Sequence, residues 1–332
     1  MWTLLRSRKA AAERQPPNAA PVGRVDVARL LHQLEWTVLR RLDGQLQGDY
    51  RQLLRGNGLE FADLREYQPQ DDVRHIDWQA TARTQTLTVR TYQEERDMTA
   101  WLVVDLSGSV RFGSGERSKH DLALEVCAVL ARLLTRRGNA VGLMLHWGGQ
   151  PGIDRMVPPG SSRRHVLRLL HDMAHAPAAE GSEGTDFGAV LQDVAGRIRR
   201  RCTVLVVSDF ISAPGWERPL SQLSQRHDLV AIRLRDPIEQ ALPALGVVPV
   251  QDAETHEILW LDSQDAGLRQ RFAELAQWRE ARLRAAWVQA SVDCLEISTE
   301  EPLDAAFLEF IRMRNPRHRA GRGLIPDSSQ HG

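Results

Sequence analysis

Residues 101–110 read WLVVDLSGSV, and this stretch decides the fold. An apolar run leads into Asp105, and two hydroxyls follow at alternate positions, Ser107 and Ser109. Apolar runs without alternation are typical of parallel strands that helices cover on both faces. The carboxylate and the two hydroxyls then stand at the carboxyl end of such a strand, which is where open parallel sheets place their ligands.

The same pattern recurs along the following hundred residues or so, as strand alternates with helix. This alternation predicts an α/β protein with a doubly wound, mostly parallel sheet and right-handed crossovers. We expect strands at 100–105, 140–146, 203–208 and 229–234, and helices at 118–137, 161–175, 186–200 and 216–227.

The flanking segments differ from this core in composition and periodicity. Apolar residues at helical spacing predict a helix from Val25 to Leu42, with Asp26 at its start. Glycines and short alternating segments indicate a small β-rich subdomain. In the tail we expect a strand near 257–261, a helix at 265–290, a strand at 292–297 and a helix at 303–314. The expected organisation is a lead-in and helix over 1–43, the β-rich subdomain over 44–98, the α/β domain over 99–235, a C-terminal α/β extension over 236–314 and a disordered basic tail over 315–332.

The composition is that of an ordinary globular protein. Apolar residues make up 42% of the 332 residues, and Lys+Arg and Asp+Glu both number 43. A balanced charge gives no reason to expect nucleic acid or a membrane surface as partner. There is no apolar run of membrane-spanning length, no secretory signal pattern, and no metal-ligand spacing among the three cysteines. We therefore expect a cytoplasmic protein with no membrane span.

Two more segments place oxygen-bearing side chains at the same edge of the expected sheet. VLVVSDF puts Asp209 after another buried strand, and GSEGTDFGAV puts Thr185 just before a helix. With Asp105, Ser107 and Ser109 they form a set of two carboxylates and three hydroxyls, all hard oxygen ligands. Such a set suits Mg²⁺ or Mn²⁺ rather than zinc. Taken by itself, the first segment can also be a polar turn with no ligand.

Other readings of these residues fit less well. The D-x-D phosphatase motif, the G-x-S-x-G elbow of serine hydrolases, the D-[ST]-G motif of aspartic proteases and the P-loop lysine are all missing here. LLHDMAH places His171 and His175 one helical turn apart, but no third ligand is evident. We interpret these two histidines as residues on the surface of an amphipathic helix.

The D-x-S-x-S, Thr and Asp constellation resembles the von Willebrand factor A-type domain and its metal-ion-dependent adhesion site. In that resemblance Asp105, Ser107 and Ser109 match the first loop, Thr185 the second and Asp209 the third. The segment 56–95 resembles the signature of the bacterial "domain of unknown function 58" (DUF58) family. The matching residues are Gly56, Gly58, Glu60, Phe61, Arg65, Tyr67, Asp71, Asp72, Arg74, Ile76, Asp77, Trp78, Ala82 and Arg83.

This resemblance implies a function as well as a fold. Members of the family are typically encoded near MoxR-type AAA+ ATPases and are thought to act with them as adaptors in chaperone-like maturation or stress functions. The expected function is therefore a non-enzymatic, metal-dependent protein-interaction module whose partner is such an ATPase or its client.

Two functions of other classes stay open. A metal-dependent hydrolase could use the same ion, but it needs a general base, and no His or Glu is obviously placed beside the site. Asp186 is the nearby candidate that the sequence offers. An RNA-binding role for the basic tail would require salt-sensitive binding.

The charged block 71–83 allows two interpretations. Its Asp and Arg residues could form an ion-pair network that docks the β-rich subdomain on the sheet, with Trp78 packed beneath it. The same residues could instead be a surface that binds a partner.

Overall fold

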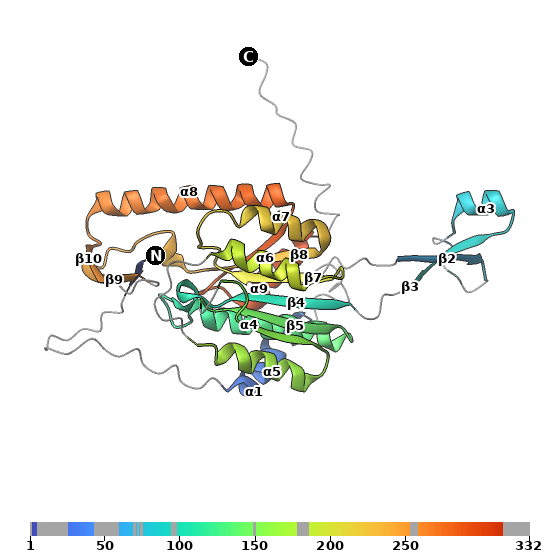
Figure 1. Cartoon of the computed structure of the whole chain (residues 1–332), viewed down its shortest axis with the longest axis horizontal. Coiled ribbons are helices and arrows are strands. Elements are labelled where there is room, and N and C mark those ends of the chain that lie inside the picture. The colour runs from blue at the N-terminus through green and yellow to red at the C-terminus, as the bar shows by residue number, and fades with distance from the viewer. Residues whose placement is uncertain are drawn as a thin grey trace, which may run out of the picture.

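A six-stranded sheet forms the centre of the protein (Figure 1). The computed structural model describes residues 2–4, 26–42, 60–68, 71, 73, 76–93, 98–148, 151–177, 186–252 and 258–314. The strand order is β11-β8-β7-β4-β5-β6, and every pair is parallel except β5–β6. The strands are β4 (Thr99–Asp105), β5 (Ala140–His146), β6 (Arg155–Gly160), β7 (Thr203–Ser208), β8 (Asp228–Arg235) and β11 (Asp293–Ser298).

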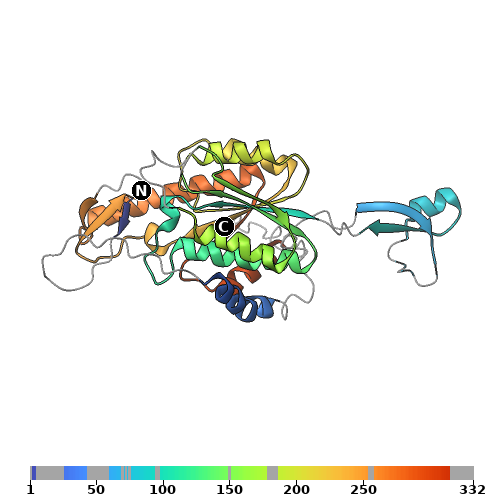
Figure 2. The same cartoon turned by 60° about the horizontal axis from the view of Figure 1, so that its bottom comes forward.

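Helices cover both faces of this sheet, as Figure 2 shows. Side chains alternate along β4, so Leu102 and Val104 enter one apolar cluster while Trp101 and Val103 enter the other. This is why the strand reads as an unbroken apolar run. One face carries α1 (Val27–Leu34), α4 (Lys119–Arg136), α5 (Arg163–Ala174) and α9 (Leu303–Arg314), and the other carries α6 (Phe187–Arg197), α7 (Glu217–Arg226) and α8 (Ala266–Ala290). The predicted doubly wound sheet is confirmed.

Strand β6 is an element that the sequence did not predict. It pairs antiparallel with β5 at one edge of the sheet and contains Pro158 and Pro159, both exposed. Proline cannot donate to a strand ladder, so it weakens a strand signal and is tolerated mainly at edges. The edge position of β6 accounts for both its sequence and the missing prediction.

The C-terminal segment contributes to two sheets. Its last strand, β11, joins the central sheet next to β8. A separate three-stranded antiparallel sheet consists of β1 (Trp2–Leu4), β9 (Val247–Asp252) and β10 (Ile258–Asp262). The predicted tail elements are present as β10, α8, β11 and α9.

The first helix begins where the sequence predicts. The Asp26 carboxylate accepts the backbone N–H groups of Ala28 and Arg29, each at 3.1 Å, and so caps α1. The helix then continues through a π-helical segment, η1 (Glu35–Leu39). Its apolar side, including Leu31, packs against α4 and α5 and belongs to the same apolar cluster.

A hairpin of β2 (Glu60–Glu66) and β3 (Thr88–Gln93), joined through α3 (Trp78–Thr84), forms a small unit that Figure 1 shows apart from the central sheet. The interpretation in which Trp78 packs beneath an ion-pair network is wrong, because 68% of Trp78 is exposed. Trp78 opens the first turn of α3, directly after Asp77. The Asp77 carboxylate caps that helix by accepting the N–H groups of Gln79 and Ala80. Several signature residues lie outside the described residues, namely Gly56, Gly58, Asp72 and Arg74.

Membrane-crossing helices are not found in the described ranges, where no helix combines the required length with the required apolar content. The basic tail, 315–332, and most of the lead-in, 5–25, lie outside the described residues.

Candidate functional site

The site lies at the point where the sheet changes winding direction. Strand β4 has β5 on one side and β7 on the other, so the carboxyl ends of β4 and β7 flank the switch point. Asp105 ends β4, and Asp209 follows β7. Both carboxylates are buried, with 2% and 1% exposure. The fold therefore brings the two predicted carboxylates to one edge.

The first loop turns its two hydroxyls toward one point. The Ser107 N–H donates to Asp105 Oδ1 at 3.0 Å, and the chain then enters a tight 3-10 turn, η4 (Gly108–Arg111). The hydroxyl oxygens of Ser107 and Ser109 lie 3.4 Å apart, and both residues are buried. Neighbouring ligands of an octahedral Mg²⁺ ion with bonds of about 2.1 Å lie about 3 Å apart. The spacing of the two hydroxyls is close to that requirement.

Asp105 itself is held by neutral donors. In addition to the Ser107 N–H, the Ser208 hydroxyl donates to Asp105 Oδ2 at 2.8 Å. Burial and the nearby charge of Asp209 raise the pKa of Asp105, although His146 opposes that rise. The charged form of this carboxylate is therefore costly unless a cation lies close to it.

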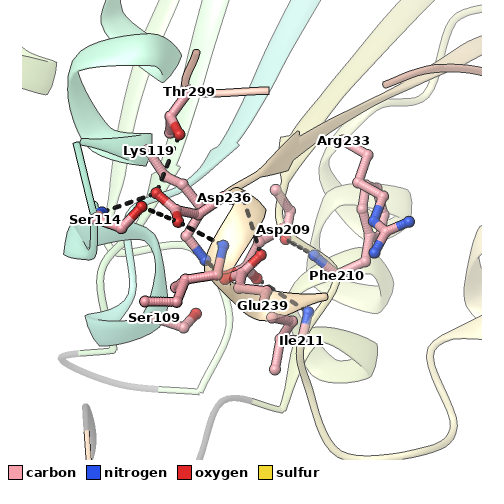
Figure 3. Close-up of polar contacts among 12 residues, drawn as sticks. Ser109, Ser114, Lys119, Asp209, Phe210, Ile211, Arg233, Asp236, Glu239 and Thr299 are labelled. Atoms are coloured by element: carbon pink, nitrogen blue, oxygen red, sulfur yellow. Dashed lines mark hydrogen bonds and ion pairs between the residues drawn. The ribbon is translucent and has the colours of Figure 1, made fainter. Parts of the chain in front are cut away.

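Asp209 is instead bound to a cation of the protein (Figure 3). Lys119, the first residue of α4, places its Nζ 2.6 Å from Asp209 Oδ2 and 2.5 Å from Glu239 Oε1. The Ile211 N–H donates to the other oxygen of Asp209 at 3.0 Å. We call Lys119, Asp209 and Glu239 the lysine triad.

The lysine triad is a buried charge cluster. Burial by itself would lower the pKa of Lys119, but the charges of Asp209 and Glu239 outweigh it and raise that pKa. The ammonium is therefore charged. Burial also raises the pKa of Glu239, Lys119 lowers it, and Asp209 raises it again. With Asp105, this edge of the sheet holds three carboxylates and one ammonium, and the ammonium contacts Asp209 and Glu239.

A second network, around the buried carboxylate of Asp236, contacts the lysine triad through Glu239. Asp236 follows β8 and accepts the Ser114 N–H at 2.9 Å, the Ser114 hydroxyl at 2.5 Å and the Thr299 hydroxyl at 3.0 Å. Its own N–H donates to Glu239 at 3.2 Å across the short helix η5 (Pro237–Glu239). Asp236 thus ties the loop before α4, the end of β8 and the loop after β11 together (Figure 3).

Polar side chains form a row across the sheet beside the site. Asp105 is paired in register with His146 on β5, and Ser208 is paired with Arg233 on β8. The Nδ1 of His146 lies 2.7 Å from the Gly152 carbonyl, which can only accept, so Nδ1 carries the proton. The Nε2 is buried and has no partner among the residues that the structure describes.

Four of the five predicted ligands lie together, and the fifth lies outside the described residues. Asp105, Ser107, Ser109 and Asp209 meet at the switch point, whereas residue Thr185 is not among the residues that the structure describes. We call the four residues that meet the carboxylate-hydroxyl site.

Two other sequence interpretations can be compared with the structure. Asp186, the candidate base, caps α6 by accepting the Ala189 N–H at 3.1 Å. His171, in the last turn of α5, and His175, which caps that helix, are exposed with their rings 4.0 Å apart, which confirms the surface interpretation.

Sequence reasoning missed Lys119, Glu239 and His146. The sequence shows no His or Glu obviously placed beside the site, whereas in the structure His146 neighbours Asp105 and Glu239 binds Lys119. Glu239 had a usable signal, since DPIE follows the carboxyl end of a predicted parallel strand. Lys119 had none, because a lysine at the start of a helix ordinarily faces solvent.

The donor chemistry fits a hard divalent cation. Within the described part of the chain, no cluster of three or more His, Cys, Asp and Glu side chains is placed to hold a metal. An ion here would therefore need the serine hydroxyls as well as the carboxylates. If Asp105, Asp209 and Glu239 are all ionised, their three negative charges exceed the single charge of Lys119 by two, which a divalent cation would neutralise.

Fold and site together define an α/β protein that gathers carboxylate and hydroxyl side chains at the switch point of its sheet. The family described as "Protein of unknown function DUF58" matches residues 63–282. The chain belongs to this family. A relative in Mycobacterium tuberculosis strain H37Rv, "Uncharacterized protein Rv1480", is 34% identical over 316 residues, which cover 94% of this chain and 98% of the relative. "Uncharacterized protein MAV169" of Mycobacterium avium is 31% identical over 166 residues, covering 50% of this chain and 98% of the relative.

Solved structures with a similar chain course show low overall similarity. The conserved hypothetical protein BatB from Bacteroides thetaiotaomicron is 12% identical with a TM-score of 0.42, covering 65% of this chain and 98% of BatB. The SpRpn10 VWA domain is 14% identical with a TM-score of 0.34, covering 64% of this chain and 93% of that domain. Scores at this level carry no functional argument.

Proposed function

We propose that this protein is a non-enzymatic, metal-dependent protein-interaction module. Its ion, Mg²⁺ or Mn²⁺, binds Asp105, Ser107, Ser109, Thr185 and Asp209. The observation that carries the proposal is the pair of buried serine hydroxyls 3.4 Å apart beside the buried carboxylate of Asp105. A cation here would compensate the burial of the Asp105 carboxylate, which otherwise has only neutral donors.

The proposed partner is a MoxR-type AAA+ ATPase or its client protein, in the cytoplasm. Membership of the DUF58 family supports this choice, since that resemblance implies the association. An ion with one open position can accept a carboxylate from a partner protein, which is a charge-assisted contact of high specificity. The ion would also stabilise the loops that it joins, because it binds the folded state only.

Calorimetry with Mg²⁺ tests the metal site. The double variant Ser107→Ala/Ser109→Ala removes two ligands but keeps every charge and the Ser107 N–H bond to Asp105. We expect its Mg²⁺ affinity to fall by at least about tenfold, since each lost ligand costs on the order of 1 kcal/mol or more. Ser224→Ala is the matched control, because the Ser224 hydroxyl donates to the Ser221 and Ala290 carbonyls, away from the site. Equal affinity in the wild type and the double variant would contradict the ligand assignment.

A pull-down with the purified MoxR-type ATPase of the same organism tests the partner. We expect capture by the wild type in Mg²⁺, and loss of capture in EDTA or with Asp105→Ala. Circular dichroism of the variant checks that the fold is kept. Equal capture under all these conditions would show that the ion does not mediate the contact.

A metal-dependent hydrolase is the second candidate function, and His146 is the observation that favours it. Its Nδ1 donates to the Gly152 carbonyl, its buried Nε2 has no partner among the described residues, and the residue is paired in register with Asp105. In a hydrolase Nε2 would accept a proton from the attacking water. Assays with phosphate and carboxylate esters in Mn²⁺ decide between the two functions. Turnover that His146→Gln abolishes would favour the hydrolase.

A further inference from the structure

We propose that Lys119 is the built-in countercharge of the site, which holds Asp209 in the absence of a divalent cation and releases it when the cation binds. This inference rests on the proposed metal site and adds how that site is regulated. In the absence of the ion, the ammonium joins Asp209 to Glu239. When the ion takes Asp209, Lys119 keeps Glu239 as its partner.

The position of Lys119 carries this inference. Its side chain has no solvent exposure, and its Nζ contacts two carboxylates that follow two different strands. One of them, Asp209, is a proposed ligand of the ion, and the other, Glu239, is not. An ammonium and a divalent cation would therefore compete for the same carboxylate.

The choice of a lysine at this position is informative. Of the 43 basic residues in the chain, two are lysines, Lys9 and Lys119, and the others are arginines. An ammonium is a compact point charge on a flexible stem, whereas a guanidinium fixes carboxylates in a planar fork. A compact charge can leave one carboxylate and keep the other without rebuilding the site.

Electrostatics sets the direction of the exchange. A divalent cation beside Ser107 and Ser109 carries twice the charge of the ammonium and repels it, while it attracts Asp209. Glu239 remains available to Lys119, because its second oxygen is held by the Asp236 N–H at 3.2 Å. Binding of the ion would therefore change the contacts of Glu239 in η5, the segment that leads from β8 toward β9.

Lysine NMR of the wild-type protein tests the exchange directly. Protein labelled with ¹³C at lysine Cε gives two lysine signals, and Lys9→Arg identifies the signal of Lys119. Titration with Mg²⁺ should shift the Lys119 signal and leave the Lys9 signal in place. If calorimetry shows that Mg²⁺ binds while the Lys119 signal stays unchanged, the countercharge role is overturned and the metal site stands.

The variant Lys119→Met provides a second measurement. Without the ammonium, the site has one more uncompensated negative charge, so Mg²⁺ affinity should rise by at least about tenfold. Lys9→Met is the matched control and should bind like the wild type. Equal or weaker affinity in Lys119→Met would contradict the proposal. If neither the wild type nor Lys119→Met binds a divalent cation, the proposed metal site itself fails. If Lys119→Met does not fold, the NMR titration of the wild type still decides.

Discussion

Two charge clusters in this protein place one cation between two carboxylates, and they differ in chemistry. The lysine triad lies at the carboxyl edge of the sheet, with Lys119 and Asp209 wholly shielded from solvent. The second cluster, which we call the arginine triad, joins Arg233 on β8 to Glu280 on α8 and Glu296 on β11. Its two glutamates are 16% and 32% exposed.

The difference separates a structural clamp from an exchangeable contact. Arg233 binds both oxygens of Glu280, at 2.8 and 2.5 Å, through the two ends of its guanidinium. Such a two-point contact fixes geometry, here the position of α8 on the sheet. Lys119 makes single-point contacts to two loops and fixes no such geometry. The arginine triad suits permanent packing, and the lysine triad suits a site that gains and loses a ligand.

The largest expected effect is on stability when a partner of the buried ammonium is removed. Asp209→Asn leaves Lys119 with Glu239 alone and should lower the free energy of unfolding by about 3 kcal/mol, because a fully buried ammonium loses one of its two charged partners. Urea unfolding measures this loss, provided that the slope of the unfolding free energy against urea concentration (the m-value) is the same in the variant and the wild type. A loss below about 1 kcal/mol would mean that the two clusters are equivalent in strength.

An exchange of the two cations should have an intermediate effect. Lys119→Arg forces a larger, planar group into a fully buried position, and Arg233→Lys loses the two-point contact to Glu280. We expect each change to lower the free energy of unfolding by about 1–3 kcal/mol. Thermal unfolding with and without Mg²⁺ distinguishes them, since the Mg²⁺-dependent shift in Tm should change in the Lys119 variant only. A change of that shift in Arg233→Lys would couple the two clusters.

The smallest effect is expected at acid pH in the arginine triad. The hydrogen bond and charge of Arg233 hold the pKa of Glu280 below its ordinary value of 4.5, against the opposing effect of partial burial. This pair therefore adds stability above pH 4.5, and the contribution is lost as the pH falls through the lowered pKa. Glu280→Gln should flatten that part of the stability profile and cost less than about 1 kcal/mol at neutral pH. Urea unfolding across this acid range checks the slope, and an unchanged slope would contradict the pairing.

Much of the fold and part of the site follow from local sequence pattern. The buried strands and the residues at their carboxyl ends could be predicted, because unbroken apolar runs and polar strand ends are local signals. Lys119 could not be predicted as a site residue, since Glu239, which binds it, lies 120 positions further along the chain. His146 was missed for a similar reason. Only the register between β4 and β5 places it beside Asp105.

The two helices at opposite ends of the described chain have a consequence for how this protein is made. Leu39 and Leu42 share one core with Phe307 and Phe310, and Arg41 pairs with Asp304, 263 positions away, at 2.8 Å. During synthesis the first helix leaves the ribosome long before α9, so the part of its apolar side that packs against α9 stays uncovered until α9 emerges. Unfinished chains thus expose a surface that chaperones and proteases recognise. The contact between the first helix and α9 can therefore form only late in synthesis.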